Sequence, residues 1–389
     1  MTHFPILSLS GSARERGVQH GRAAASRVAH SVASYARLFA YYRGQAWSEM
    51  QRRAAAYLPV LEAHAPALLD EMRGIADGSG RAFEEILALN VRTELLAGAL
   101  VASQHAGFDA ATATNCAAGV PQHADAAGTG ASGGVISECT TVAALPEASL
   151  GGRTWLAQNW DWSGDQRPAC VVLRIAQSGR PNVLTMTEAG IVGKIGINSA
   201  GVAVALNILS STCDGREPGM PVHVLLRLMM DAESLEDAQA LTRLAQAGGS
   251  SCITIADARG SAVCLEITPA GVGELHPIDG LLAHSNHCLC ANTQPIASAI
   301  PVKSSTVPRY SRASHLLQSL RGRIDAPALQ SLLRDREGDG LAICRYPDMN
   351  LHPVERVESV CGVLMDTQSR VMHLSPDVPE RAPFDAIAV

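Results

Sequence analysis

The sequence predicts an α+β fold in which antiparallel sheets are covered by helices. Residues 1–95 carry apolar side chains at helical spacing, whereas the chain from residue 139 onward contains short apolar and β-branched runs separated by Gly, Pro and Asn. An Ala- and Gly-rich stretch, at about residues 96–134, lies between these two parts. Blocks of helices and blocks of strands, without a regular strand–helix alternation, are typical of this class.

The composition is that of a globular protein with room for one large or two medium domains. The chain has 389 residues, of which 47% are hydrophobic and 17% charged. Its net charge is −6 and the two signs are interspersed, so we expect no nucleic-acid partner. No stretch reaches the ~20 apolar residues that span a bilayer. The start, "MTHFPILSLSGSARERG", lacks the pattern of a signal peptide, so we expect a soluble, cytoplasmic protein without a membrane partner.

The first 95 residues are predicted to be helical after a short strand-like run, "FPILSL". A second helical segment ends at "DGSG", residues 77–80, and "AFEEILALNVRTELL" forms a third. The apolar residues that recur at helical spacing in the first two segments are Val28, Val32, Tyr35, Phe39, Tyr42, Leu61, Leu68, Met72 and Ile75.

The stretch between the helical and strand-rich parts has the composition of a connector. Of the 34 residues from Val101 to Gly134, 17 are Ala or Gly, and no Lys or Arg occurs between Thr93 and Gly152.

The part after residue 139 is predicted to be strands with two helical interruptions. A helix with Ser234 as its N-cap is expected to run to the Gly248–Gly249 pair, and another covers about 309–334. "GVLMDTQSRVMHLS" has the pattern of a hairpin that turns at "TQSR". The predicted strands are "TWLAQNWDW", "ACVVLRIAQ", "NVLTMTEAG", "GVAVALNIL", "SCITIAD", "AVCLEIT" and "GLLAHSN".

The chain has 10 Cys and no CxxC pair, so the default interpretation is reduced, mostly buried thiols. One cluster, "HSNHCLC", could hold zinc through His284, His287, Cys288 and Cys290. Its spacing matches no standard structural zinc pattern well, so zinc is an alternative and not the main hypothesis.

Cys139, in "ISECTTVAAL", is the thiol with a possible special role, because a strand-like run begins there directly after the connector. Taken alone, it is most simply a core thiol. If the chain were cut before it, however, the new α-amino group, with a pKa near ~8, would lie beside its own thiol. One residue would then supply both nucleophile and general base, helped by an acidic partner and an amide donor. Spacing alone does not select those partners.

Several longer motifs carry a family resemblance. They resemble, in matching order over most of the chain, the acyl-CoA:6-aminopenicillanic acid acyltransferase (isopenicillin N acyltransferase) family. The motifs are "TEAGIVGKIGINSAGVAVALNIL" (187–209), "QNWDW" (158–162), "HSNHCL" (284–289), "AICR" (342–345), and "GVQHGRAA", "EMRGIADG" and "LNVRTE" nearer the start.

The resemblance implies an N-terminal nucleophile hydrolase, with a four-layer αββα sandwich and a precursor that cuts itself before a Cys. Cleavage between Glu138 and Cys139 would give an α chain, residues 1–138, and a β chain, residues 139–389. Both would belong to one folded unit, an α/β heterodimer.

The same resemblance assigns catalytic roles to four residues. Cys139 would be the nucleophile and Asp161 would orient its freed amine. Asn286 would stabilise the oxyanion, and Arg345 would favour the thiolate.

Two further positions match the family less informatively. Asn207 is either a pocket residue or the cap of a strand end. Thr268 stands where the family has Ser, and the resemblance implies that it lines the substrate pocket as well. His284 and His287 would support Asn286 through hydrogen bonds.

The implied reaction forms an acyl-enzyme on Cys139 and passes the acyl group to water or to an amine. The substrate would be a small-molecule amide, penicillin-like or peptide-like, or an acyl thioester with an amine acceptor. Acyl-CoA is a possible co-substrate; no other cofactor and no metal is expected.

The chain departs from the family in two places. The residue before the Cys is Gly in the family and Glu138 here, and the segment before it is much longer. Glu138 therefore also motivates a second hypothesis, an uncleaved, non-catalytic relative that binds small molecules. "TNCAAG", around Cys116, is a rival cleavage site that lacks the following Thr pair.

Overall fold

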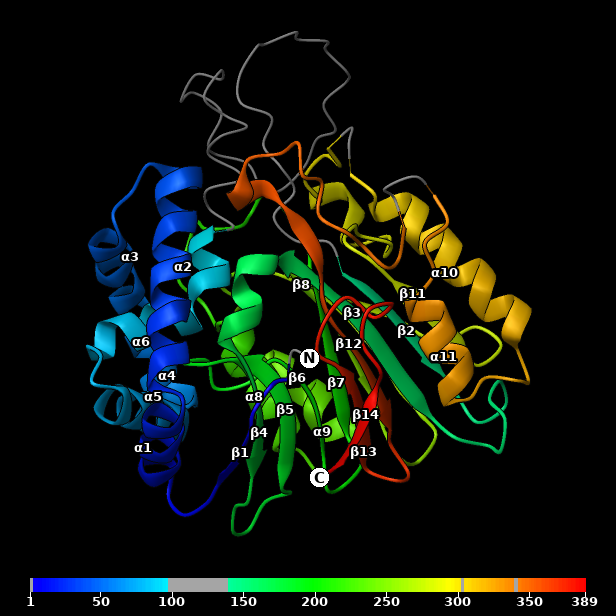
Figure 1. Ribbon diagram of the computed structural model, residues 1–389, viewed down its shortest axis with the longest axis horizontal. Coiled ribbons are helices and arrows are strands. Elements are labelled where there is room, and N and C mark those ends of the chain that lie inside the picture. Colours follow the sequence, from blue (N-terminus) through cyan, green and yellow to red (C-terminus); the bar gives the residue numbers. More distant parts are fainter. Residues whose placement is uncertain (1–2, 97–138, 302–303, 339–341) are drawn as a thin grey trace, which may run out of the picture.

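A computed structural model describes residues 3–96, 139–301, 304–338 and 342–389. In these ranges two sheets face each other, and helices cover the outer face of each (Figure 1). This arrangement confirms the predicted α+β class and the αββα sandwich. Residues 97–138, which include Cys116, Glu138 and nearly all of the predicted connector, lie outside the described ranges.

The first sheet has eight strands in the order β1-β4-β5-β6-β7-β8-β9-β10. Its neighbours pair antiparallel except for β1 and β4, which are parallel. The strands are β1 (Ile6–Leu9), β4 (Cys170–Ile175), β5 (Val183–Glu188), β6 (Ile195–Asn198), β7 (Ala203–Ile208), β8 (Ser251–Ala256), β9 (Ala262–Thr268) and β10 (Gly271–Leu275).

The second sheet has six antiparallel strands in the order β11-β2-β3-β12-β13-β14. They are β2 (Thr140–Ala144), β3 (Trp155–Ser163), β11 (Leu281–His284), β12 (Val357–Asp366), β13 (Val371–Ser375) and β14 (Asp385–Ala388).

The helices form the two outer layers. Helices α10 (Thr306–Leu320) and α11 (Ala326–Leu333) cover the second sheet, at the right of Figure 1. No helix in the described ranges combines the length and apolarity needed to cross a membrane. The helices on the side of the first sheet are α1 (Ala13–Ala23), α2 (Ala25–Arg43), α3 (Trp47–Ala54), α4 (Leu58–His64), α5 (Pro66–Ser79), α6 (Phe83–Asn90), α8 (Val222–Met230) and α9 (Leu235–Ala240).

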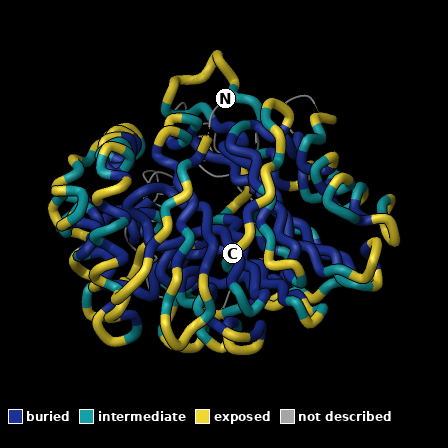
Figure 2. Tube along the Cα trace, turned by 60° about the horizontal axis from the view of Figure 1, so that its bottom comes forward, coloured by how far each residue is buried: buried dark blue, intermediate teal, exposed yellow. Residues whose placement is uncertain are grey.

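Alternation along β3 explains how one sheet serves two cores. Successive side chains of a strand point to opposite faces, so each face of β3 is buried against a different layer. Leu156, Trp160 and Trp162 pack into the core between the sheets, whereas Trp155 and Ala157 pack against α10 and α11. Figure 2 shows the buried residues gathered along the strands, with exposed residues in the outer loops and helices.

The N-terminal segment shares the core of the rest of the chain. Strand β1 pairs with β4, and α1 packs closely on α5 through glycines. A Cβ atom at Gly17 would lie 2.0 Å from the carbonyl oxygen of Glu71, so only glycine allows this approach. Residues 3–96 and 139–389 thus bury apolar surface against each other.

Most predicted elements are present, with some boundaries shifted. The hairpin at 367–370, the helix stop at Gly80 and the N-cap at Ser234 are confirmed. The helix after Ser234 ends at Ala240, before the Gly pair, and 309–334 is two helices and not one. Strands β6, β10 and β14 and helix α8 were not predicted. Helix α8 is a short, almost entirely buried apolar run, and the periodicity of such a run does not distinguish a helix from a buried strand.

Candidate active site

Cys139 lies at the start of β2, on the face of the second sheet that looks toward the first sheet. Its side chain is only 1% exposed, and its Sγ lies 3.9 Å from the carbonyl oxygen of Asp161. Thr141, two residues later on the same face, bonds across the sandwich to Asn207 of β7. The alternation of β2 therefore directs the Cys139 thiol into the space between the sheets.

The main chain of Cys139 is held from both ends by side chains. Its N–H donates to Asn286 Oδ1 at 2.6 Å. Its carbonyl oxygen accepts from Asn207 Nδ2 at 3.0 Å and from Arg309 Nη1 at 2.6 Å. Hydrogen bonds on both sides of Cα fix the position of this one residue more tightly than sheet pairing alone would do.

Asn286 follows β11 and turns both ends of its amide toward the site. Its Oδ1 also accepts from Arg309 Nη2 at 3.0 Å, while its Nδ2 donates to the carbonyl oxygen of Ile208 at 2.9 Å. Because one Nδ2 hydrogen suffices for Ile208, the second remains available for an oxygen that develops negative charge.

Glu266 of β9 anchors the loop that carries Asn286. The carboxylate accepts from the main-chain N–H groups of Leu289 at 2.6 Å and Cys290 at 3.1 Å, and from the Thr293 hydroxyl. It also accepts from His284 Nε2 at 2.9 Å. Although burial alone would raise it, these partners, His284 first, lower the pKa of Glu266 to about 2.

Asp161 of β3 is fully buried, and only one of its two carboxyl oxygens accepts a hydrogen bond from a described residue. Its Oδ1 accepts from the Ser359 hydroxyl at 2.7 Å, whereas its Oδ2 has no hydrogen-bond partner among the described residues. Burial raises the pKa of this carboxyl to about 8, against the opposing charge of Arg309 and the Ser359 bond. A buried carboxylate oxygen without a donor is costly, so this atom marks a place for one.

Arg345 is connected to the site by hydrogen bonds to two serines. Its main-chain N–H donates to Ser359 Oγ at 2.9 Å, and its Nη1 donates to Ser305 Oγ at 3.0 Å. Burial lowers the pKa of the guanidinium to about 10, so Arg345 remains cationic at neutral pH. The structure thus brings Arg345 into the hydrogen-bond network around Asp161.

Arg309 of α10 is a central residue that the sequence did not reveal. It is 0% exposed and donates to Cys139 O, Thr140 Oγ1, Asn286 Oδ1 and Ser305 Oγ at 2.6–3.0 Å. Arg309, Ala313 and Leu317 are buried at successive four-residue steps, so an Arg at the start of an apolar stripe was the available signal. Its cation lies where a thiolate and a carboxylate need one.

The two candidate pocket residues lie in different settings. Asn207 bonds Thr141 Oγ1 and the carbonyl oxygen of Cys139, so it contacts the backbone of the nucleophile candidate. Thr268 lies at the turn from β9 to β10, where its hydroxyl bonds the main chain of Ala270 and Gly271.

The potential zinc ligands are arranged differently from the sequence hypothesis. Among the described residues, Cys252, Cys264 and His284 are the group with convergent ligand atoms, whereas His287, Cys288 and Cys290 are not part of it. The two sulfurs lie 2.9 Å apart, closer than the roughly 3.7 Å that tetrahedral Zn–S bonds of about 2.3 Å imply. Both His284 ring nitrogens already bond oxygen atoms, of Ser285 and Glu266. This geometry favours a protonated histidine paired with Glu266.

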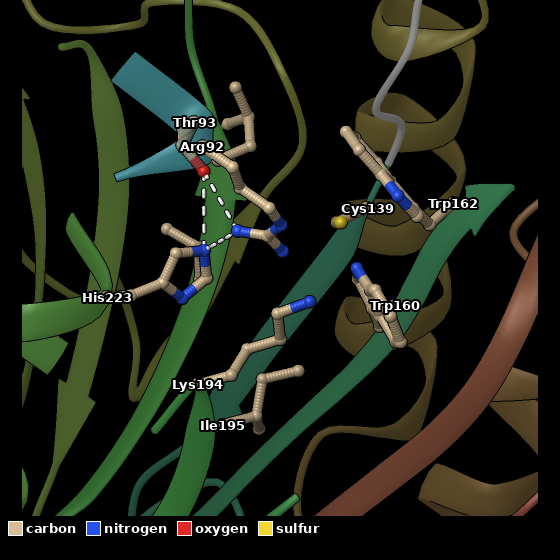
Figure 3. A pocket seen from close by; sticks show the side chains of 10 residues that line it. Arg92, Thr93, Cys139, Trp160, Trp162, Lys194, Ile195 and His223 are labelled. Carbon is tan, nitrogen blue, oxygen red and sulfur yellow. Dashed lines mark hydrogen bonds between the residues drawn. The ribbon is translucent and has the colours of Figure 1, made fainter. Parts of the chain in front are cut away.

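A small, partly open pocket lies beside the Cys139 thiol. In Figure 3 the ends of Arg92 and Lys194 lie on one side of Cys139, and Trp160 and Trp162 lie on the other. The lining residues are Arg92, Thr93, Cys139, Trp160, Trp162, Lys194, Ile195, Leu206, Ile208 and His223. A cavity with apolar walls and a few convergent polar groups is typical of a small-molecule site.

Two sequence comparisons match the chain to known proteins. Residues 149–374 match the family described as acyl-coenzyme A:6-aminopenicillanic acid acyl-transferase. The chain is 30% identical to the 40 kDa form of acyl-coenzyme A:6-aminopenicillanic-acid-acyltransferase from Emericella nidulans, over 87% of this chain and 84% of that protein.

Solved structures with some likeness include a conjugated bile acid hydrolase variant from Clostridium perfringens, with 14% identity, a TM-score of 0.47 and coverage of 64% of this chain and 92% of that one. Another is penicillin V acylase from Agrobacterium tumefaciens, with 13% identity, a TM-score of 0.42 and coverage of 64% and 86%. The two sequence comparisons show that the chain belongs to the acyl-coenzyme A:6-aminopenicillanic acid acyl-transferase family.

Proposed function

We propose that the chain cuts itself before Cys139 and then uses this residue as an N-terminal nucleophile in amide hydrolysis or acyl transfer. One observation carries the proposal: the Cys139 nitrogen, and not only its thiol, is held by a side chain, Asn286 Oδ1 at 2.6 Å. Every buried N–H needs an acceptor, but here the acceptor belongs to the same amide whose Nδ2 is the candidate oxyanion donor, so one side chain serves both the nitrogen of Cys139 and the reacting carbonyl. Membership of the family makes the chain an enzyme of acyl transfer or amide hydrolysis.

The proposed maturation begins when the Cys139 thiol adds to the carbonyl carbon of Glu138. The S–C bond forms and the C–N bond breaks, the nitrogen takes the thiol proton, and a thioester remains. Water hydrolyses the thioester, which releases a chain ending at Glu138 and restores the Cys139 thiol beside its free α-amine. Arg309 and Arg345 favour the attacking thiolate electrostatically.

The proposed turnover uses the same groups on an external acyl compound. The α-amine accepts the thiol proton, the sulfur attacks the substrate carbonyl, and the leaving amine or thiol departs with that proton. Asn286 Nδ2, which lies 2.9 Å from the Ile208 oxygen, supplies its second hydrogen to the oxyanion. Water or an amine then attacks the thioester and frees the Cys139 sulfur.

The partner that we propose for the freed amine is Asp161. Its unpaired Oδ2 lies in a site where Cys139 Sγ and the Asp161 carbonyl are 3.9 Å apart. An ammonium group there would supply the missing donor and lower the pKa of the carboxyl from its value of about 8. Asp161 would thus orient the amine in the mature enzyme.

The proposed substrates are small-molecule amides, or an acyl thioester such as acyl-CoA together with an amine acceptor. The name of the Emericella nidulans relative includes both acyl-coenzyme A and 6-aminopenicillanic acid. After cleavage, residues 1–138 and 139–389 would remain associated as an α/β heterodimer, because β1 pairs with β4 and the N-terminal helices share the main core.

The test is to trap the acyl-enzyme. Purified protein is mixed with N-acyl p-nitroanilides or a short acyl-CoA, quenched in acid and weighed by mass spectrometry. We expect the 139–389 fragment to gain one acyl group, and Cys139→Ala to gain none. Adding an amine acceptor separates hydrolysis from transfer, since transfer yields a new amide. A full-length, unlabelled protein with all substrates would instead favour the uncleaved binding protein.

A further inference from the structure

The pocket beside Cys139 displays positive charge on otherwise apolar walls. Arg92 and Lys194 are 4% and 1% exposed, and no acidic residue is among the ten described residues that line the pocket. Leu206, Ile208 and the two tryptophans supply the apolar part. Buried cations on the surface of a cavity are unusual unless something pairs with them.

One carboxylate behind the pocket pairs with both cations. Glu188 Oε2 accepts from Arg92 Nη2 at 2.7 Å and from Lys194 Nζ at 2.5 Å, and Glu188 Oε1 accepts from the Tyr35 hydroxyl. Two positive groups against one negative group leave one positive charge uncompensated in this cluster.

The neighbouring histidine does not change this charge count. His223 accepts from Arg92 through Nε2 and donates from Nδ1 to the Gly193 carbonyl at 3.3 Å, which is the neutral tautomer. Burial first, and then the charges of Arg92 and Lys194, lower its pKa well below the usual value. Glu94, the next carboxyl along, bonds the Val222 N–H, and burial raises its pKa to about 7.

Lys194 also retains donor capacity toward the cavity. An ammonium group has three N–H donors, and Glu188 takes one while the face of Trp160 lies 3.4 Å from Nζ. Figure 3 shows this ammonium group and the Arg92 guanidinium on the same side of the Cys139 sulfur. An anion in the pocket would therefore meet a free donor, a net positive charge and little competing water.

We propose that Arg92 and Lys194 form a subsite for a carboxylate of the substrate, so the enzyme acts on acyl compounds that carry an anionic group near the reacting carbonyl. The inference rests on the proposed function of Cys139. This carboxylate can belong to the acyl group or to the amine of the substrate. In either case Arg92 and Lys194 would bind it.

Two matched substrate pairs distinguish these sources. Glutaryl and valeryl p-nitroanilide differ in whether a five-carbon acyl group ends in a carboxylate or a methyl group. N-valeryl-4-aminobenzoate and N-valeryl-aniline differ only in a carboxylate on the amine. We expect kcat/KM to favour the carboxylated member of one pair by at least about fivefold, the size of a modest charge-assisted bond.

Lys194→Met should then reduce that preference at least about fivefold, whereas Lys194→Arg retains the charge and keeps it. Lys194→Met leaves Glu188 paired with Arg92 and Tyr35, and circular dichroism checks its fold. The exposed Arg52→Met is the matched control for loss of a cation elsewhere.

A preference below fivefold in both pairs would overturn the subsite. So would a preference that Lys194→Met leaves unchanged while all rates fall together, because the cations would then only activate the thiol. Acylation of Cys139 without any carboxylate preference refutes the subsite alone. Absence of both chain cleavage and acylation removes the proposed function, and the subsite with it.

Discussion

Replacing Asn286 separates the two tasks that the structure gives to its amide. In Asn286→Ala, the oxyanion loses a donor, which costs about 2.7–4 kcal/mol of transition-state stabilisation, or roughly 10²–10³ in kcat. The same change removes the acceptor for Cys139 N–H and Arg309 Nη2, which lie 2.6 and 3.0 Å away. Leaving these buried donors short of a partner costs about 1–3 kcal/mol each in stability.

Asn286→Asp is the matched variant. A carboxylate still accepts from Cys139 N–H and Arg309, but it has lost the Nδ2 donor that faces the Ile208 oxygen. Its second oxygen then faces the Ile208 carbonyl oxygen, so we expect Asn286→Asp to lose about 1–3 kcal/mol of stability, less than the alanine variant, and to mature, yet to turn over as slowly as that variant. Asn286→Ala should be deficient in stability as well as in turnover.

The assays are urea unfolding, intact mass after purification, and release of p-nitroaniline from the best substrate of the panel above. If Asn286→Ala keeps kcat within threefold of wild type, Asn286 is not the oxyanion donor. If Asn286→Asp retains full turnover, acceptance at Oδ1 and not donation from Nδ2 is what catalysis requires.

Four further outcomes follow from the same geometry. In the Cys139→Ala background, the carboxyl of Asp161 has a pKa of about 8 in the folded chain and near 3.8 in the unfolded chain, so between pH 5 and 7 only the folded chain keeps this proton. The free energy of unfolding should therefore fall by up to about 1.4 kcal/mol for each pH unit as the pH rises from 5 to 7. Adding Asp161→Asn should flatten that slope in urea titrations, and an unchanged slope counts against the raised pKa. Glu266→Gln leaves His284 buried without its counter-charge and should cost about 3–5 kcal/mol in unfolding free energy; a loss below about 1 kcal/mol would contradict the pairing. Arg309→Met should raise the pH at which iodoacetamide alkylates Cys139, and an unshifted profile would remove its electrostatic role. Glu138→Gly should mature at least as fast as wild type, followed by gel electrophoresis over time; slower cleavage would mean that the Glu138 carboxylate takes part.

Local patterns were sufficient for most of the fold. Alternation in "TWLAQNWDW" and the turn at "TQSR" depend on neighbours along the chain, and both elements are present. Helix α8 was missed because it is a short, mostly apolar run, which a buried strand would match equally well. Strands β6, with four residues, and β14, with four, are too short to carry a recognisable alternation.

The candidate site was predicted less completely than the fold, because several of its contacts join residues far apart in the sequence. The motifs indicated Cys139, Asp161 and Asn286, and the structure places all three around the start of β2. Arg309 was missed because its importance depends on α10 packing across the strand that Cys139 begins, a contact spanning 170 residues of sequence. Lys194 lies in the motif of residues 187–209, but no local sequence pattern indicated that its ammonium group lines the pocket.

The central claim is that Cys139 becomes a new N-terminus. Intact-mass analysis of the purified wild-type protein tests it directly, together with 2-cyanobenzothiazole, which condenses with an N-terminal cysteine but not with an internal one. We predict two chains, 1–138 and 139–389, whose masses sum to that of the full chain plus one water, with only the second labelled. Cys139→Ala should give a single unlabelled chain. A single full-length wild-type species that stays unlabelled after long incubation would contradict the account.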